Sequence, residues 1–440
     1  MIFKTFWYYW RAKKRWKFTN RQQLEQHQLR ELARFRHRVL AKSPYFSSYG
    51  DLSLAEYPFM NKAIMMENFD QMNTAGLKCD ELLACARLSE QSRDFTPTVG
   101  KFSVGMSSGT SGQRGLFVAS PKERSIWAGT LLAKMLPNGL FHGERVALFL
   151  RAGNNLYESV QNRWISFRFF DLFADFNQQV QALVAYQPTI IVAPAQVLRA
   201  LALKIQQGET SLPPVKVISV AEVLEPQDRQ LLQAVFRDVG EIYQATEGFL
   251  ACTCSHGTLH LNEEFLHIEP KWIDESRFNP IITDFTRETQ PIVRYQLDDI
   301  LVVRKKPCAC GNPALAIERI EGRNDDQLIL PALTGGTVSI FADPCSRIIA
   351  NTLPLTSDYR LTQTALSLKL EGNCSIEVLQ HCQSALSDYF AKQGVDIDKI
   401  EWQCVSQVIL PDLFNKRRRI IRCAVKPRPS GRGYKARFSD

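Results

Sequence analysis

The sequence predicts an α/β fold: a large N-terminal part on mixed and parallel sheets, followed by a small α+β part. Two observations indicate this class. Short apolar, strand-like runs at 145–150, 189–194 and 215–220 are separated by helical stretches, a pattern typical of parallel strands joined by helices. After about residue 325 the pattern changes to strand, helix and strand, which predicts a separate small α+β domain.

Length and composition are those of a globular protein. The chain has 440 residues, of which 45% are hydrophobic and 22% charged, so a disordered chain or a small disulfide scaffold is excluded. Eleven cysteines, an odd number, and the lack of a secretory signal favour a reducing compartment. We therefore expect a cytoplasmic protein, with membrane association depending on its N-terminal segment.

Positive charge is concentrated at the two ends of the chain. Residues 1–40 and 415–440 each carry a net charge of +9, which leaves −9 on the residues between them. A nucleic-acid-binding protein usually has a basic patch on its folded domain. Because the body is acidic, we expect no nucleic-acid partner.

The N-terminal segment allows two interpretations. Residues 1–17 mix aromatic and basic side chains, which suits a helix lying on a membrane surface. The alternative is a helix that packs its aromatic side chains onto the body of the protein. A further helix is predicted over 18–46, with Thr19 or Asn20 as its cap and Pro44 as its end.

A segment rich in serine, threonine and glycine lies at 107–115, with the sequence SSGTSGQRG. Its glycines and hydroxyl groups supply N–H and O–H donors that can surround phosphate oxygens. It has neither the Walker A pattern nor the spacing of a dinucleotide-binding loop. Taken alone, the segment is equally well explained as a solvent-exposed loop.

Four more segments give this loop a context: EIYQATEG at 241–248, VRYQLDDI at 293–300, GRNDD at 322–326 and FNKRRRI at 414–420. In this order and spacing, the five segments resemble those of the adenylate-forming superfamily of acyl-CoA synthetases and adenylation domains. The phenylacetate–CoA ligase-like branch is the most similar, and the resemblance spans about residues 20–425.

The resemblance implies three parts and an activity. The parts are an N-terminal helical part of an adenylation domain (1–100), its ATP- and acid-binding core (101–324), and a small mobile C-terminal domain with a basic tail (325–440). The activity is that of an AMP-forming ligase. An aryl or fatty carboxylic acid reacts with ATP to give an acyl-adenylate and pyrophosphate, and the acyl group then passes to CoA or to a carrier-protein phosphopantetheine thiol.

Two other functions fit the same segments. One is a nucleotidyl transferase that attaches AMP to a cofactor, and the other is a nucleotide-binding protein with weakened catalysis. For the ligase, the acid-binding pocket is expected to draw on residues near 151–175, 219–224 and 243–249.

The resemblance also implies roles for single residues in the phosphate region. Tyr243 is expected against the adenine, Thr246 at the phosphates, and Glu247 on Mg²⁺, a cation that prefers carboxylate oxygen. Arg114 takes the place of the usual lysine of the phosphate loop. The expected loop residues are Ser107, Ser108, Gly109, Thr110, Ser111, Gly112 and Arg114.

The remaining assignments concern the ribose, the hinge and the C-terminal lysine. Asp299 is expected to accept hydrogen bonds from both ribose hydroxyls, with Asp298 as a one-residue alternative. Arg323 belongs to the nucleotide site, and Asp325 matches the pivot about which the C-terminal domain turns. Lys416 matches the lysine that bridges the carboxylate and the α-phosphate, although three arginines follow it directly.

Thiol and imidazole groups recur in two places, Cys252-Thr253-Cys254 with His256 and His260, and Cys308-Ala309-Cys310. Such groups suit a tetrahedral Zn²⁺ site. The resemblance selects Cys254, His260, Cys308 and Cys310, which as four protein ligands make the metal structural. Cys252 and His256 are the rival ligands, and free buried thiols are the other explanation.

Overall fold

The structure is a computed structural model that describes residues 2–14, 17–50, 52–92, 94, 97–107, 114–136, 139–150, 165–410 and 416–423. The chain divides into two compact units. The first unit consists of Met1–Asn324 and Pro411–Arg417, and the second of Asp325–Leu410 and Arg418–Asp440. Among the described residues, no helix combines the length and apolar character needed to cross a membrane.

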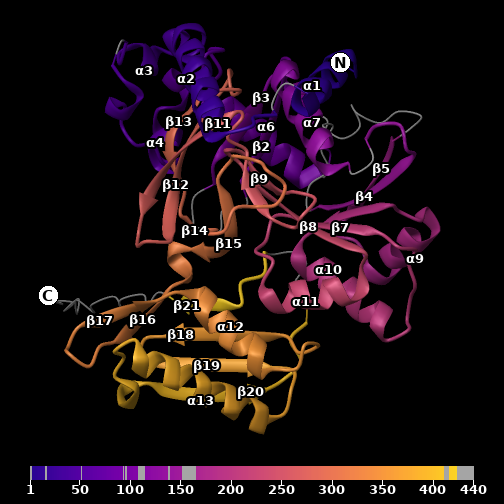
Figure 1. Cartoon of the computed structure of the whole chain (residues 1–440), viewed down its shortest axis with the longest axis vertical. Coiled ribbons are helices and arrows are strands. Elements are labelled where there is room, and N and C mark those ends of the chain that lie inside the picture. The colour runs from indigo at the N-terminus through magenta and orange to yellow at the C-terminus, as the bar shows by residue number, and fades with distance from the viewer. Residues whose placement is uncertain are drawn as a thin grey trace, which may run out of the picture. The chain divides into compact units, whose positions relative to one another are not determined.

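The first unit begins with helices. They are α1 (Ile2–Lys14), α2 (Arg21–Arg38), α3 (Pro44–Ser47), α4 (Lys62–Glu67), α5 (Phe69–Met72) and α6 (Cys79–Ser92). Helix α1 packs along α7 (Pro121–Met135) (Figure 1). Its Tyr9 is buried, whereas the side chains of Phe3, Trp7 and Trp10 are exposed.

The helix predicted over 18–46 is shorter in the structure. Asn20 caps α2 by accepting a hydrogen bond from the backbone N–H of Gln23, as one of the two predicted caps. The helix ends at Arg38, before Pro44. Pro44 is instead the first residue of α3, because a proline lacks the N–H that the first turn of a helix leaves unpaired anyway.

A three-stranded antiparallel sheet precedes α7. Its strands are β1 (Thr98–Val99), β2 (Phe102–Met106) and β3 (Leu116–Ala119). Helix α7 follows β3 directly, and its start is fixed by a capping box between Ser120 and Glu123 and by Pro121 in the first turn.

The main sheet of the first unit has twelve strands, of which β4–β8 form its parallel half in the order β8-β7-β6-β4-β5. These strands are β4 (Glu144–Leu150), β5 (Ile165–Asp171), β6 (Ile190–Ala193), β7 (Lys216–Ser219) and β8 (Asp238–Ala245). The helices between them are α9 (Phe176–Tyr186), α10 (Ala195–Gln206) and α11 (Pro226–Val235). This alternation is the one that the sequence predicts.

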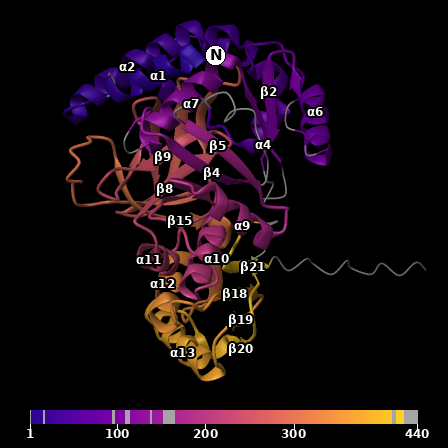
Figure 2. The same cartoon turned by 90° about the vertical axis from the view of Figure 1, so that its right-hand side faces the viewer.

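Helices cover both faces of the parallel half. Val146 and Leu148 of β4 share a hydrophobic core with Leu131 and Leu132 of α7. Helices α9, α10 and α11 lie on the opposite side of these strands from α7 (Figure 2). Because both faces are covered, the inner strands β4 and β6 carry continuous buried apolar runs, 146–149 and Ile190–Ala193, rather than an alternating pattern.

The other half of the main sheet is antiparallel and continues from β8. Its strands are β9 (Gly248–Thr253), β10 (Leu259–Leu261), β11 (Leu266–Trp272), β12 (Arg277–Asp284), β13 (Ile292–Gln296), β14 (Asp299–Val303) and β15 (Ala316–Arg323). Strand β8 is therefore shared by the two halves, and the turn from β8 to β9 carries the predicted segment 241–248.

The second unit is a small α+β structure with its own core. Its strands are β16 (Leu328–Pro331), β17 (Thr337–Ile340), β18 (Tyr359–Thr364), β19 (Ser367–Gly372), β20 (Glu401–Ser406) and β21 (Ile420–Cys423). Helices α12 (Ala342–Thr352) and α13 (Ile376–Lys392) pack on one face of the β20-β19-β18-β21 sheet (Figure 2). Together the two units confirm the predicted fold class.

Candidate active site

Two predicted nucleotide-site residues meet through a short hydrogen bond. The hydroxyl of Tyr243 on β8 donates to Oδ2 of Asp299, the first residue of β14, at 2.6 Å. Arg323, which faces Asp299 across the β14–β15 pair, places its Nε 3.4 Å from Oδ1 of the same carboxylate. Asp299, rather than its neighbour Asp298, therefore receives the Tyr243 hydroxyl.

Glu247 belongs to the same group. It lies in the turn between β8 and β9, is buried, and accepts a hydrogen bond from Tyr295 of β13. Tyr243, Glu247, Tyr295, Asp299 and Arg323 are called the tyrosine–carboxylate cluster below. Sequence reasoning missed Tyr295, although it follows Arg294 in one of the five recognised segments.

The cluster suits a bound cation. Burial raises the pKa of both tyrosine hydroxyl groups above the usual value, and the carboxylates of Asp299 and Glu247 raise it further for Tyr243. Both tyrosines are therefore hydrogen-bond donors at neutral pH. Two carboxylates face one guanidinium, so the cluster has an excess negative charge, and carboxylate oxygens are the ligands that Mg²⁺ prefers.

The Ser/Thr/Gly segment connects β2 to β3. Ser107 and Gly115 close its base: the Ser107 N–H donates to the Gly115 carbonyl, and the Gly115 N–H donates to Oγ of Ser107, both at 2.8 Å. The other predicted loop residues, Ser108, Gly109, Thr110, Ser111 and Gly112, lie outside the described residues.

Arg114 has a carboxylate partner in the structure. Its Nη1 and Nη2 donate to the two carboxylate oxygens of Glu90 in α6 at 2.7 and 2.6 Å, and its Nε donates to the Ser107 carbonyl at 3.0 Å. A bidentate pair of this kind fixes the orientation of the guanidinium. Arg114 therefore braces the base of the loop, and its predicted phosphate contact remains a prediction.

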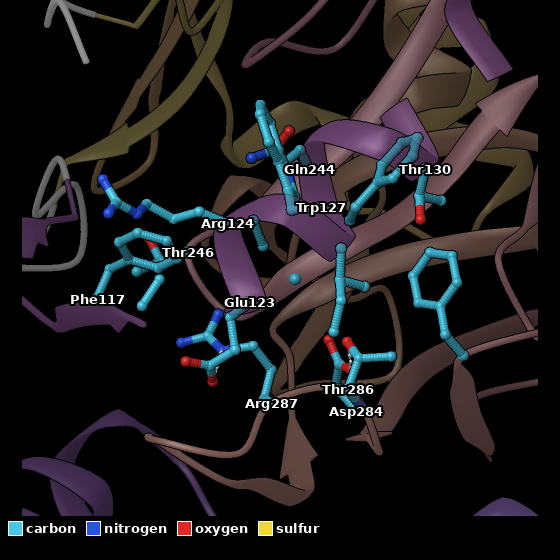
Figure 3. A pocket seen from close by; sticks show the side chains of 16 residues that line it. Phe117, Glu123, Arg124, Trp127, Thr130, Gln244, Thr246, Asp284, Thr286 and Arg287 are labelled. Carbon is cyan, nitrogen blue, oxygen red and sulfur yellow. Dashed lines mark hydrogen bonds and ion pairs between the residues drawn. The ribbon is translucent and has the colours of Figure 1, made fainter. Parts of the chain in front are cut away.

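A pocket lies beside the β8–β9 turn and encloses about 590 Å³, including its open mouth (Figure 3). Thr246 lines this pocket, while the next residue, Glu247, belongs to the tyrosine–carboxylate cluster. Its aromatic lining residues are Phe117, Trp127, Phe249 and Phe265. Of the three regions expected to form the acid pocket, only 243–249 lines it. Residues 219–224 and 165–175 do not, and 151–164 lies outside the described residues.

One wall of the pocket carries buried charges. Oε1 of Glu123 accepts hydrogen bonds from the backbone N–H groups of Glu288 and Thr289 at 2.8 and 2.9 Å, and it lies 4.0 Å from Nε of Arg287. Asp284 accepts from the Thr286 N–H and hydroxyl at 2.8 and 2.6 Å. Burial raises the pKa of Asp284 to about 6.

The predicted hinge residue Asp325 and the predicted catalytic lysine Lys416 belong to different units of the chain. Asp325 is the first residue of the second unit, and its side chain lies outside the described part of the chain. Lys416 belongs to the first unit and directly precedes Arg417, whose guanidinium pairs with the buried Asp228 of α11. The Arg417 N–H also lies 3.2 Å from Oε1 of Glu222. The backbone at Lys416 is thereby held next to α10 and α11.

The four predicted zinc ligands lie together, with all their ligand atoms within 4.8 Å of one another. Sγ of Cys254 is 3.6 Å from Sγ of Cys308, and Sγ of Cys310 is 3.3 Å from Nε2 of His260. With Zn–S bonds of about 2.3 Å, neighbouring ligands of a tetrahedral site lie about 3.8 Å apart. The donor set and its spacing therefore fit Zn²⁺.

The surroundings of the four side chains agree with this fit. Nδ1 of His260 lies 3.1 Å from the Ala314 carbonyl, a contact that leaves Nε2 for a metal when Nδ1 carries the proton. The rival Cys252 instead contacts Asn262, and the rival His256 contacts Ser255. Among the residues that the structure describes, neither rival belongs to the cluster.

No protein-family model matches the sequence, and no curated protein matches it. The structure, in contrast, matches solved proteins over most of its length. A 2-hydroxyisobutyryl-CoA ligase in its postadenylation state, in complex with R3-HIB-AMP, has a TM-score of 0.63 at 15% identity, covering 91% of this chain and 88% of that one. The fold is shared with a CoA ligase.

Two more solved structures are similar over shorter stretches. The anthranilate CoA ligase AuaEII in complex with anthranoyl-AMP has a TM-score of 0.50 at 13% identity, covering 71% of this chain and 64% of that one. An ATP-bound RpMatB-BxBclM chimera has a TM-score of 0.50 at 12% identity, covering 72% and 67%. At these identities the likeness establishes the fold and leaves the activity to be argued from the residues.

Proposed function

We propose that this protein is an AMP-forming ligase of the adenylate-forming superfamily, in its phenylacetate–CoA ligase-like branch. One observation carries the proposal: Thr246 lines a pocket of aromatic side chains, and its neighbour Glu247 belongs to the tyrosine–carboxylate cluster. A single turn thus joins a site suited to an organic acid to a site suited to a nucleotide and its metal.

The reaction has two steps. An oxygen of the carboxylate attacks the α-phosphorus of ATP, the bond from that phosphorus to the bridging oxygen breaks, and pyrophosphate leaves. A thiolate of CoA or of a carrier-protein phosphopantetheine then attacks the acyl carbon and displaces AMP. Because negative charge meets negative charge in the first step, positioning and electrostatic stabilisation provide most of the catalysis.

Each residue of the site has a proposed part in the first step. Asp299, oriented by Tyr243 and Arg323, accepts hydrogen bonds from the ribose hydroxyls. Glu247 would hold Mg²⁺, and the charge of the metal would offset that of the phosphates. Thr246 and the 107–112 segment donate to phosphate oxygens. Lys416 bridges the carboxylate and the α-phosphate, and a backbone change at Asp325 exchanges the two half-reactions.

Zinc has a structural part in this proposal. Cys254, His260, Cys308 and Cys310 would hold Zn²⁺, and with four protein ligands the metal would have no open position for substrate. Cys254 directly follows β9, His260 lies in β10, and Cys308 and Cys310 lie in the segment between β14 and β15. The metal would therefore tie together three neighbouring parts of the sheet that also carries the tyrosine–carboxylate cluster.

A peripheral membrane contact through residues 1–17 is a separate part of the proposal. The exposed aromatic side chains of Phe3, Trp7 and Trp10 lie on a helix that also carries Lys4 and Arg11, a combination that suits an anionic lipid surface. Co-sedimentation with vesicles of phosphatidylcholine alone or mixed with phosphatidylserine tests it. Loss of binding in Trp7→Ala/Trp10→Ala supports the contact, and equal sedimentation of the variant and the native protein contradicts it.

The activity is tested by trapping the intermediate. The protein is incubated with ATP, Mg²⁺, hydroxylamine and single members of a panel of aryl and fatty acids. An acyl hydroxamate and AMP are expected with at least one acid. Stable attachment of AMP to a cofactor would identify a nucleotidyl transferase instead. ATP binding without hydroxamate or AMP would indicate a nucleotide-binding protein with weakened catalysis.

A further inference from the structure

The pocket is lined by one side of helix α7. Arg124, Trp127 and Thr130 follow one another at three-residue intervals and all face the pocket. At 1.5 Å per residue, Arg124 and Thr130 are about 9 Å apart along the helix axis. Figure 3 shows Arg124 and Thr246 toward one end of the pocket and Thr130 toward the other.

At the two ends of this row lie polar side-chain atoms for which the described residues offer no hydrogen-bond partner. Oγ1 of Thr130 is buried, and no hydrogen-bond partner for it is found among the described residues. A threonine within a helix can donate to the carbonyl four residues earlier, which here would be that of Ile126. Nε of Arg124 is likewise buried without a partner in the described part of the chain.

The guanidinium of Arg124 differs from those of Arg114 and Arg287, which each have a carboxylate partner. Arg114 is paired with Glu90, and Arg287 lies 4.0 Å from Glu123. For Arg124 no carboxylate lies within ion-pair distance among the residues described. The half-buried guanidinium of Arg124 is therefore available to pair with an anion in the pocket. Thr246 lies at the same end of the pocket, and its neighbour Glu247 belongs to the tyrosine–carboxylate cluster.

We infer that the pocket takes an aromatic carboxylic acid that carries a hydroxyl or amino group para to its acid arm. The inference rests on the proposed function, which sets the reacting carboxylate at the Thr246 end. The carboxylate lies at Arg124, the ring lies among the aromatic side chains of the pocket, and the para substituent pairs with the Thr130 hydroxyl. Polar groups at both ends of a pocket with aromatic walls match an aromatic acid with polar groups at both ends better than a fatty acid.

The buried hydroxyl of Thr130 gives the pocket a preference for acids that carry the para group. An acid without the para group leaves the Thr130 oxygen unpaired in the complex, whereas a para hydroxyl or amine satisfies it. Sites that hydrogen-bond a substrate hydroxyl discriminate strongly against the analogue that lacks it. We expect a preference of about 10-fold or more in kcat/KM for the para-substituted acid.

The experiment compares matched acids with matched variants. Benzoate, phenylacetate and cinnamate are each paired with their 4-hydroxy forms, and octanoate represents fatty acids. The full-length protein, Thr130→Val and Thr130→Ser are assayed for acid-dependent pyrophosphate exchange. Thr130→Val keeps the volume and removes the hydroxyl, whereas Thr130→Ser keeps the hydroxyl. Thermal unfolding of each variant verifies folding, and Thr130→Ala replaces Thr130→Val if the latter is unfolded.

The expected result is a preference for one 4-hydroxy acid over its parent, retained in Thr130→Ser and lost in Thr130→Val. In Arg124→Met, KM for the parent acid and for the 4-hydroxy acid should both rise about 10-fold or more. Lys122 is an exposed neighbour on α7, and Lys122→Met should leave both KM values unchanged. Equal use of the paired acids, a preference for octanoate, or a preference that survives Thr130→Val would overturn the inference.

Calorimetry of the same acids separates this inference from the proposed function. Binding of a 4-hydroxy acid that depends on Thr130, without pyrophosphate exchange, supports the pocket assignment and contradicts the ligase. Pyrophosphate exchange that is the same in the native protein and in the Thr130 variants supports the ligase and contradicts the pocket assignment. Absence of both exchange and binding for every aromatic acid contradicts both.

Discussion

The Tyr243 hydroxyl donates a 2.6 Å hydrogen bond to Oδ2 of Asp299, which lies 56 residues further along the chain. This bond fixes one oxygen of the carboxylate, and Arg323 approaches the other. Asp299 is therefore oriented before any nucleotide binds. Such preorganisation reduces the cost of ordering the site in the complex.

Tyr243→Phe should weaken ATP binding. The change removes one hydrogen bond to a charged group and leaves the ring in place, so we expect the Kd for ATP to rise about 3- to 10-fold. Calorimetry with ATP measures it. Tyr186→Phe, which removes a 2.8 Å contact to Ser166 away from the cluster, is the control. An unchanged Kd in Tyr243→Phe would contradict the orienting role.

Asp284 should make the protein less stable as the pH rises. Burial raises its pKa to about 6 in the folded state from 3.8, so between these values the folded state binds more protons than the unfolded state. Raising the pH through this window therefore lowers the free energy of unfolding, by an amount on the order of 3 kcal/mol.

Asp284→Asn should remove this pH dependence. Asparagine keeps an oxygen that can accept the hydrogen bonds from Thr286, and it is neutral at every pH. Arg287 still has the Glu123 carboxylate 4.0 Å from its Nε. Urea unfolding at pH 4 and pH 7 should show the variant more stable than the native protein at pH 7 and equal to it at pH 4. The same stability difference at both pH values would argue against the raised pKa.

Zinc removal should destabilise the first unit. Metal analysis should find about one zinc per chain, and Cys308→Ser should lose it. Since loss of a structural metal is among the changes that exceed about 4 kcal/mol, the melting temperature should fall by roughly 10 °C. Cys85→Ser, outside the cluster, should retain the metal. A stable native protein free of zinc would remove this assignment.

Gly129→Ala should disturb the contact between α1 and α7. A Cβ at Gly129 would lie 2.6 Å from the Thr5 carbonyl oxygen and 2.8 Å from the Tyr9 nitrogen, both backbone atoms of α1. Overpacking costs about 1–3 kcal/mol, against a gain of about 1 kcal/mol in helix propensity. A lower melting temperature and faster proteolysis near residue 15 are expected.

The control for this change is Gly105→Ala, whose new Cβ would meet nothing closer than 3.9 Å. It should leave the protease pattern of the N-terminal segment unchanged. If Gly129→Ala were as stable and as protease-resistant as the native protein, α1 would not be held on α7 in solution.

Lys416→Ala should separate the two half-reactions. Loss of the bridging cation should slow formation of the acyl-adenylate about 100-fold or more, while thioester formation from a supplied acyl-adenylate stays within a few-fold. Single-turnover assays of each step measure this, with Lys392→Ala at the exposed end of α13 as the control. Equal loss of both steps would contradict the assignment.

The sequence predicts those parts of this structure that depend on local pattern. Helices α9 and α10 and strands β4, β6 and β7 lie where apolar periodicity places them, because each is determined by neighbours in the chain. The end of α2 was predicted at Pro44 and is found at Arg38, because proline is compatible with starting a helix as well as with ending one.

Several residues of the candidate site stand out in the sequence, whereas their contacts do not. Tyr243, Glu247 and Asp299 were recognised from their segments, whereas Tyr295, which joins Glu247, had no signal apart from its position beside Arg294. The pairing of Arg114 with Glu90 could not be foreseen, because the two residues lie 24 positions apart. The pocket wall from α7 was missed for the same reason, since its partners come from β8–β9 and from the segment after β12.

The central claim is that the β8–β9 turn brings an acid and ATP together, and acid-dependent exchange of labelled pyrophosphate into ATP tests it most directly. With the panel of aryl acids, the account predicts exchange by the native protein that requires acid and Mg²⁺ and is abolished by Glu247→Gln and by Asp299→Ala. Exchange that is absent with every acid while ATP binds normally, or that persists undiminished in both variants, would contradict it.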